Sequence, residues 1–173
     1  MERMYDQIQA LPRRPLIPEL LPRPERLVLA YPVLDLATSS SPSRSLYMGD
    51  PIAPLNLILQ CRAAYCPPSA QVTAVRARVA LPRLPAQRQK CALLSPLLAP
   101  ERALARFPPT FFVVGTLDPF LDDSVALAHK LDAAGVPVAL KALEELPHSF
   151  FHFMLLLRGA VDGVDQFARW LKP

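Results

Sequence analysis

The fold is decided by residues 110–148, which read TFFVVGTLDPFLDDSVALAHKLDAAGVPVALKALEELPH. Thr110 to Thr116 is apolar, β-branched and aromatic, as is typical of a strand buried on both faces of a parallel sheet. Leu121 to Ala134 carries apolar residues at helical spacing, and a glycine follows where a C-terminal cap belongs. Val136 to Leu143 has the pattern of a second strand. The stretch therefore predicts one βαβ unit of an open parallel sheet.

Each of these two strands is followed by a titratable residue, Asp118 after the first and His148 after the second. Ligands and chemistry in open α/β sheets gather at the carboxyl ends of the strands. Taken singly, Asp118 fits an ordinary turn before Pro119, and His148 fits a loop histidine without chemistry. As a pair in this order, they match the last two members of the Ser…Asp…His order found in α/β-hydrolases.

Several separated motifs resemble hormone-sensitive lipases, which are serine ester hydrolases of the α/β-hydrolase fold. These motifs are Ala30-Tyr31-Pro32, Ser41-Pro42-Ser43-Arg44, Asp50-Pro51, Ser95 to Pro100, Leu117 to Ser124 and Leu146 to Phe150. The resemblance runs from about Leu21 to the end and is weak between about Pro67 and Lys90. It implies an α/β fold class, the C-terminal half of an α/β-hydrolase with about three parallel strands and flanking helices, and with the nucleophile-elbow half absent.

The resemblance implies triad roles for two residues, the catalytic pair Asp118 and His148. A serine hydroxyl is a weak nucleophile until an imidazole can take its proton, and His148 would be that base. Asp118 would hold the imidazole in one tautomer and stabilise the imidazolium. Ser149 stands where the family usually has glycine, and a positive φ there would cost a serine roughly 1 kcal/mol.

The nucleophile is missing from the pattern. An esterase of this kind needs a G-x-S-x-G elbow and a glycine-rich loop that stabilises the oxyanion. The chain has five glycines, and none flanks a serine in that arrangement. We expect the chain alone to be inactive and to be the C-terminal portion of a hydrolase, from a fragment or an incomplete gene model. The alternative is a short protein that has lost catalysis and serves as a lipid- or partner-binding module.

Outside the deciding stretch, the prediction is an irregular segment over 1–21 and a partial α/β-hydrolase domain over 22–173. Within the domain, about 67–90 is expected to be a mobile, basic, proline-containing loop. Leu27 to Tyr31 is the first convincing strand, and its unpaired side would allow self-association through a sheet edge. Pro54 to Tyr65 predicts a helix, Ser41 to Arg44 a turn within a loop. A closing helix over Gly159 to Leu171 is expected to bury Val161, Val164, Phe167, Ala168 and Leu171.

The composition of the chain limits the kinds of partner that we expect it to bind. The 173 residues carry a net charge of +4, but the basic residues lack the interleaved aromatics of a nucleic-acid surface, so no nucleic acid is expected. The three cysteines match no zinc pattern and are read as reduced thiols of a cytoplasmic protein. No metal or cofactor is predicted, and no run is long enough to span a membrane. The expected partner is a hydrophobic ester or lipid substrate, with association at a lipid surface considered.

The remaining notable side chains are given structural readings. Asp122 and Asp123 are read as negative charges of a first helical turn rather than metal ligands. Tyr31, Trp170 and the Cys61/Cys66 pair are read as packing residues. His129 is expected in solvent, and His152 is expected beside its neighbouring phenylalanines. Core packing is favoured over an acyl pocket for the apolar segment that includes Phe150, Phe151, Phe153 and Met154 to Leu157.

Overall fold

The structure, a computed structural model, describes residues 24–37, 41–65, 92 and 94–172. Its strands are β1 (Leu27–Ala30), β2 (Thr110–Gly115) and β3 (Val138–Leu143). Its helices are α2 (Pro42–Leu46), α3 (Leu55–Tyr65), η2 (Pro96–Leu98), α5 (Glu101–Leu104), α6 (Leu121–Ala133), η3 (Phe150–Phe153) and α7 (Arg158–Leu171). The predicted βαβ unit is confirmed as β2, α6 and β3.

The three strands form one parallel sheet in the order β1-β2-β3. The register places Leu27 beside Thr110 and Thr110 beside Val138. The third strand begins two residues later than predicted because Pro137 has no N–H to donate, although its carbonyl still accepts from the Thr110 amide at 2.9 Å. Strand β1 lies at one edge, and no strand of the described residues pairs with its other side.

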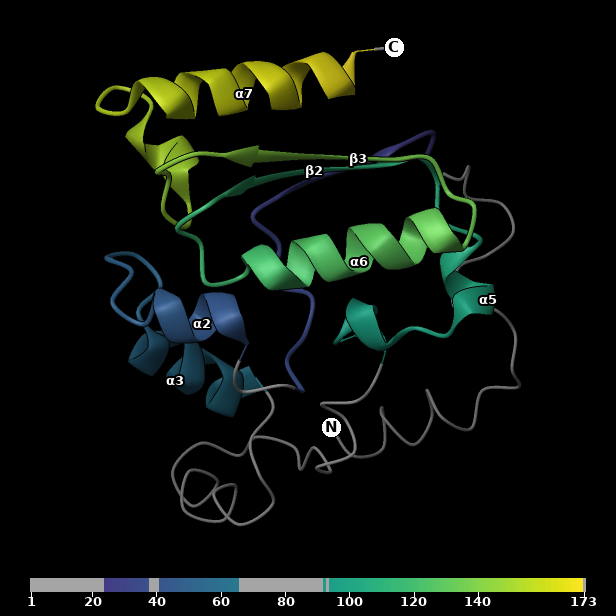
Figure 1. Ribbon diagram of the computed structural model, residues 1–173, viewed down its shortest axis with the longest axis horizontal. Coiled ribbons are helices and arrows are strands. Elements are labelled where there is room, and N and C mark those ends of the chain that lie inside the picture. Colours follow the sequence, from purple (N-terminus) through teal and green to yellow (C-terminus); the bar gives the residue numbers. More distant parts are fainter. Residues whose placement is uncertain (1–23, 38–40, 66–91, 93, 173) are drawn as a thin grey trace, which may run out of the picture.

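Helices cover both faces of the sheet (Figure 1). Helix α6 packs on β2 and β3 from one side, and α7 packs on β1 and β2 from the other. Neighbouring residues of β2 serve the two layers in turn: Phe112 joins the α6 cluster and Val113 the α7 cluster, both fully buried. A strand buried on both faces should alternate in this way, so the continuous apolar run of the sequence is explained.

The inward face of α7 agrees only in part with the prediction. Val164 and Phe167 are half-buried, and Phe167 packs against the core, but Val161, Ala168 and Leu171 are exposed and Ala160 and Gly163 are the buried residues. Gly163 decides the face because a Cβ there would lie 2.5 Å from Phe150 Cε2 and 2.6 Å from Leu143 Cδ1. Glycine lets the helix approach the sheet closely, and a count of apolar side chains misses it.

The predicted turn at Ser41 to Arg44 is the beginning of a helix. Ser41 lies at the N-cap of α2, its hydroxyl accepts from the Arg44 amide at 3.3 Å, and Pro42 follows at the first helical position. The helix predicted over Pro54 to Tyr65 is confirmed as α3, and Cys61 on it is exposed rather than packed.

The segment Met154–Leu156 is exposed, contrary to the core reading. Leu155 is 99% exposed and Leu156 80%, while Phe150 is fully buried. His152 is also exposed, and its Nδ1 lies 3.1 Å from the Ser149 carbonyl rather than among aromatic rings. His129 is exposed on α6, as predicted.

Two predicted features lie outside the described residues: the irregular segment 1–21 and the basic loop of about 67–90, together with Cys66. The division into 1–21 and 22–173 therefore stays a prediction. Among the residues that the structure describes, no helix is long and apolar enough to cross a membrane.

Candidate active site

The end of β2 and the loop after β3 approach each other closely at Gly115. A Cβ on this residue would lie 2.0 Å from the Leu146 carbonyl oxygen, so only glycine permits the contact. The Leu146 carbonyl accepts from the Leu117 amide at 3.1 Å, and the Thr116 hydroxyl accepts from the Glu145 amide at 2.9 Å. These bonds tie the two loops that carry Asp118 and His148.

Asp118 is held by the turn between β2 and α6. Its side chain is fully buried, and Oδ1 accepts from the Phe120 amide at 2.7 Å. The Asp118 carbonyl accepts from the Leu121 amide at 3.1 Å, which begins the helix. Its second oxygen, Oδ2, lies 2.9 Å from Nδ1 of His148. The predicted pair is therefore in hydrogen-bond contact across 30 residues of sequence.

Two aromatic rings contact the imidazole of His148. Tyr31 and Phe120 meet the imidazole edge to face, with ring centroids 5.1 Å and 5.2 Å away. The side chain remains 16% exposed, so one part of the ring faces open space while Nδ1 faces Asp118. Tyr31, read from the sequence as packing, is thus a direct neighbour of the imidazole. Burial, and then the Asp118 charge, raise the pKa of the Tyr31 phenol above its ordinary value.

Two residues next to this ring have positive φ angles. Ser149 has φ 56° and ψ 29°, so the position after His148 does have the positive φ that glycine adopts most easily. Tyr31, at the end of β1, also has a positive φ of 39°. Strained backbone of this kind persists where surrounding contacts hold it, and it gathers at functional sites.

A cavity of about 570 Å³ opens beside His148. Its walls are mainly apolar and come from the loop after β1, from η2 and its approach, and from the region of α3. They are formed by Val33, Leu36, Ile52, Ala53, Leu57, Ile58, Cys61, Arg62, Leu94, Pro96, Phe120, His148 and Ser149. A mainly apolar cavity with one imidazole in its wall suits a hydrophobic molecule that meets a proton-transfer group.

Asp50 contacts the site and is missing from the predicted catalytic residues. It lies in the loop before α3 and is only 5% exposed. Its Oδ2 accepts from the His148 backbone amide at 3.1 Å. The Asp50-Pro51 motif is visible in the sequence, but nothing in its local pattern indicates a partner 98 residues away.

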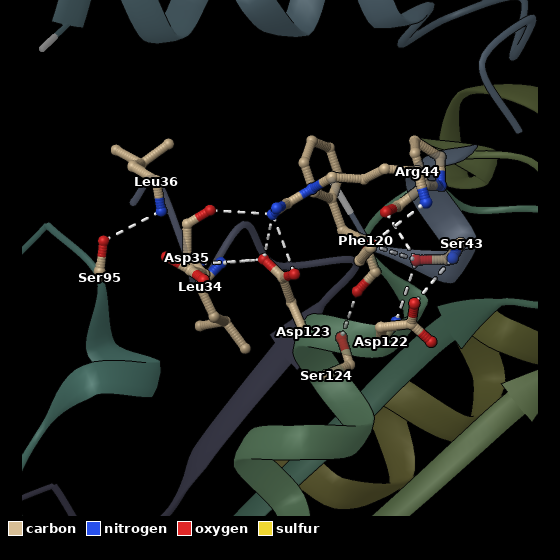
Figure 2. Close-up of polar contacts among 12 residues, drawn as sticks. Leu34, Asp35, Leu36, Ser43, Arg44, Ser95, Phe120, Asp122, Asp123 and Ser124 are labelled. Carbon is tan, nitrogen blue, oxygen red and sulfur yellow. Dashed lines mark hydrogen bonds and ion pairs between the residues drawn. The ribbon is translucent and has the colours of Figure 1, made fainter. Parts of the chain in front are cut away.

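A buried ion pair between Arg44 and Asp123 lies close to Phe120 (Figure 2). Arg44 Nη2 lies 2.9 Å and 2.8 Å from the two carboxylate oxygens of Asp123. The Leu34 and Asp35 amides donate to Asp123 Oδ2 at 3.1 Å and 3.0 Å. Burial raises the pKa of Asp123 to about 6, and the Arg44 charge with these two amides opposes that rise. Asp123 lies in the first turn of α6, as predicted, and in addition it binds Arg44 and the loop after β1.

The neighbouring carboxylate, that of Asp122, connects the start of α6 to α2. Asp122 Oδ2 accepts from the Ser43 amide at 2.7 Å, and the Ser43 hydroxyl donates to the Pro119 carbonyl at 2.9 Å. Arg44 also places its guanidinium carbon 5.4 Å from the centre of the Phe120 ring. Phe120 thus joins the ion pair to His148. Within the described ranges, no group of three or more His, Cys, Asp or Glu side chains could hold a metal ion.

Comparison with known proteins identifies the family. Residues 13–152 match the family model of the α/β-hydrolase fold, which is most of the chain. The chain belongs to this family, and its partial parallel sheet with helices on both faces agrees with that assignment.

The similar proteins within the family are lipases and esterases. Over 65 residues the chain is 49% identical to hormone-sensitive lipase of Mus musculus, covering 38% of this chain and 9% of the lipase. An esterase of Fusarium pseudograminearum is 40% identical over 63 residues, 36% of this chain and 19% of the esterase. The predicted resemblance to hormone-sensitive lipases is confirmed, and the family is one of carboxylic ester hydrolases.

Solved structures agree. A hormone-sensitive lipase from a metagenome library has 28% identity and a TM-score of 0.69, covering 87% of this chain and 45% of that one. Carboxyl esterase 2 of Tuber melanosporum has the same fold, at 23% identity with a TM-score of 0.69, covering 87% and 46%. The chain thus spans less than half the length of these solved relatives and a far smaller share of the curated ones.

Proposed function

We propose that this chain is the C-terminal part of a serine carboxylic-ester hydrolase and that it carries the acid–base half of the triad. The carrying observation is the 2.9 Å contact between Asp118 Oδ2 and His148 Nδ1, with the ring edge reaching a mainly apolar cavity. The substrate class is an ester of a hydrophobic acid or alcohol, in keeping with that cavity and with the lipases and esterases it resembles.

The proposed chemistry assigns one task to each residue. A serine hydroxyl from a segment outside these 173 residues attacks the acyl carbon and passes its proton to the free ring nitrogen of His148. His148 then gives the proton to the leaving alcohol, and in the second half it activates the water that hydrolyses the acyl-serine. Asp118 keeps Nδ1 protonated and stabilises the imidazolium. No G-x-S-x-G occurs in the sequence, so the chain alone should turn over no ester.

The test compares two proteins with a p-nitrophenyl ester of medium chain length. One is the 173-residue chain, and the other is the same chain extended by, or co-folded with, a segment that supplies the elbow and the oxyanion loop. We expect hydrolysis only in the second protein, with a loss of about a thousandfold or more in kcat for His148→Ala. Hydrolysis by the short chain that survives His148→Ala would contradict the assignment.

A second function is favoured by one observation, the exposed apolar segment Met154–Leu156. Leu155 and Leu156 are almost fully exposed on the loop between η3 and α7. Such a segment fits a protein that associates with a lipid surface or a partner, with or without catalysis. Flotation with neutral-lipid emulsions tests this: Leu155→Asp/Leu156→Asp should abolish association, and unchanged flotation would exclude this segment as the contact.

We also infer a cytoplasmic location. The exposed thiol of Cys61 supports a reducing compartment, since exposed thiols are at risk of oxidation elsewhere. Fractionation of cells expressing the tagged, complete protein would test the location directly.

A further inference from the structure

Asp50 accepts three backbone hydrogen bonds although it lies outside the proposed triad. Its Oδ1 accepts from the Ile52 amide at 2.8 Å and from the Ala53 amide at 2.6 Å. Its Oδ2 accepts from the His148 amide at 3.1 Å. The two oxygens therefore serve two different parts of the chain.

The Oδ1 bonds alone would explain an aspartate at this position. They close the turn that leads into α3, as aspartate does in many turns. The Oδ2 bond needs a separate reason, because it reaches the residue that carries the imidazole. Ile52 and Ala53 line the cavity, and so does His148. One buried carboxylate therefore joins the wall of the cavity to the backbone of the base.

The position of the Oδ2 bond matters for the ring. His148 is followed by Ser149 in a left-handed conformation, which costs a serine about 1 kcal/mol relative to ordinary backbone. The hydrogen bond at the His148 amide holds the chain directly before this strained residue. Asp118 restrains the ring through Nδ1, but it cannot by itself fix the backbone from which the ring projects.

We propose that Asp50 is a positioning residue for His148, a second carboxylate that fixes the main chain of the base while Asp118 fixes its ring. A movement of Ile52 and Ala53, which line the cavity, would then change the orientation of the His148 ring. The catalytic meaning of this assignment rests on the proposed hydrolase function, but the contact with His148 does not.

Asp50→Asn separates the two jobs of the carboxylate. The asparagine side chain has one accepting oxygen, which can keep the two bonds from the Ile52 and Ala53 amides. Its NH2 group then faces the His148 amide, and because both groups are donors, that hydrogen bond is lost. Asp50→Ala removes all three bonds. Asp122→Asn is the matched control, because its carboxylate also accepts from a backbone amide of a distant segment, that of Ser43 in α2 at 2.7 Å, without contacting His148.

The first readout is the His148 ring in the full 173-residue chain, labelled with 15N-histidine and followed by NMR. Only three histidines are present, and His129 and His152 are exposed internal references. Asp50→Asn should make the Nδ1 proton exchange with water about tenfold faster, the effect of losing one ordinary hydrogen bond, and should mix the two tautomers. Asp122→Asn should leave both signals as they are in the unsubstituted chain.

The second readout is ester hydrolysis by the extended protein. Asp50→Asn should lower kcat about tenfold with KM within about twofold, because the aim of the base changes while the cavity remains. Unchanged ring signals in Asp50→Asn would overturn the positioning role, whatever the activity. Changed ring signals, in an extended protein that hydrolyses no ester, would support the positioning role and refute the hydrolase function instead.

Discussion

At the scale of single residues, Ser149 occupies a backbone position that glycine adopts more easily. Its φ of 56° lies in the left-handed region, where a side chain with a Cβ is strained. The departure could be predicted because the resemblance places glycine there. The conformation could not, because φ depends on where the surrounding chain holds the loop.

Ser149→Gly should therefore stabilise the chain by about 0.5 kcal/mol or less, because the left-handed penalty of about 1 kcal/mol is partly offset by the greater freedom of glycine in the unfolded state. Urea unfolding followed by circular dichroism measures the change. Ser124→Gly, within α6, is the contrasting substitution and should destabilise the chain. A loss of stability in Ser149→Gly would show that the serine side chain makes a contact worth more than the strain.

Asp123 gives a prediction about pH. Its pKa in the folded chain is raised to about 6 by burial, while an unfolded aspartate titrates near 3.8. Between these values the folded chain binds the extra proton, so this carboxyl lowers stability as pH rises through the window. The free energy of unfolding of the unsubstituted chain, minus that of Asp123→Asn, should fall between pH 4 and 6 and stay flat above. A rise over that window would mean that the Arg44 pairing outweighs burial.

At the scale of elements, the approach of β2 to the loop after β3 depends on Gly115. Gly115→Ala should cost at least about 1–3 kcal/mol, because its Cβ would overlap the Leu146 carbonyl, which cannot move without its loop. It should also lengthen the contact between Asp118 and His148, visible as loss of the protected Nδ1 proton. Gly49→Ala is the control, since nothing lies within 4 Å of a Cβ there.

Elements with strong local signals could be predicted from the sequence. The unit β2-α6-β3 follows from an apolar run, a helical period and the cap at Gly135, whose φ is 77°. Helix α2 could not, because its five residues are set by the Ser41 cap and the buried Arg44 rather than by a period. The inward face of α7 was predicted only in part, because a buried glycine has no side chain to count.

The candidate site divides in the same way. Asp118 and His148 follow from the rule that parallel strands bring their carboxyl ends to one edge. Asp50 and the pair of Arg44 with Asp123 depend on contacts over 98 and 79 residues, which no local pattern encodes. A carboxylate in a loop has many ordinary uses, so only the fold separates the one that reaches the base.

At the scale of the whole molecule, β1 has one side without a partner strand among the described residues. The amides of Leu27 and Tyr31 donate towards β2, to the carbonyls of Pro109 and Val113, so alternation turns the Val28 and Ala30 amides outward. No strand of the described chain receives them. Unpaired edges recruit other chains, and we expect the 173-residue chain to self-associate.

Val28→Pro should reduce that association, because it removes an outward donor and leaves the bonds to β2 in place. Leu29→Pro, whose amide faces β2, should instead destabilise the sheet. Sedimentation velocity at several concentrations distinguishes the two effects. A monodisperse monomer in the unsubstituted chain would contradict the role of this edge.

The contacts around His148 also suggest an order of assembly. Asp118 lies 30 residues before it in the chain and Asp50 lies 98 residues before it. Closing the shorter loop costs less entropy, and contacts between near neighbours in sequence tend to form sooner during folding. The contact between His148 and Asp118 should therefore form early during folding, and the loop that carries Asp50 should pack against His148 afterwards. The cavity would then be the last part of this region to form.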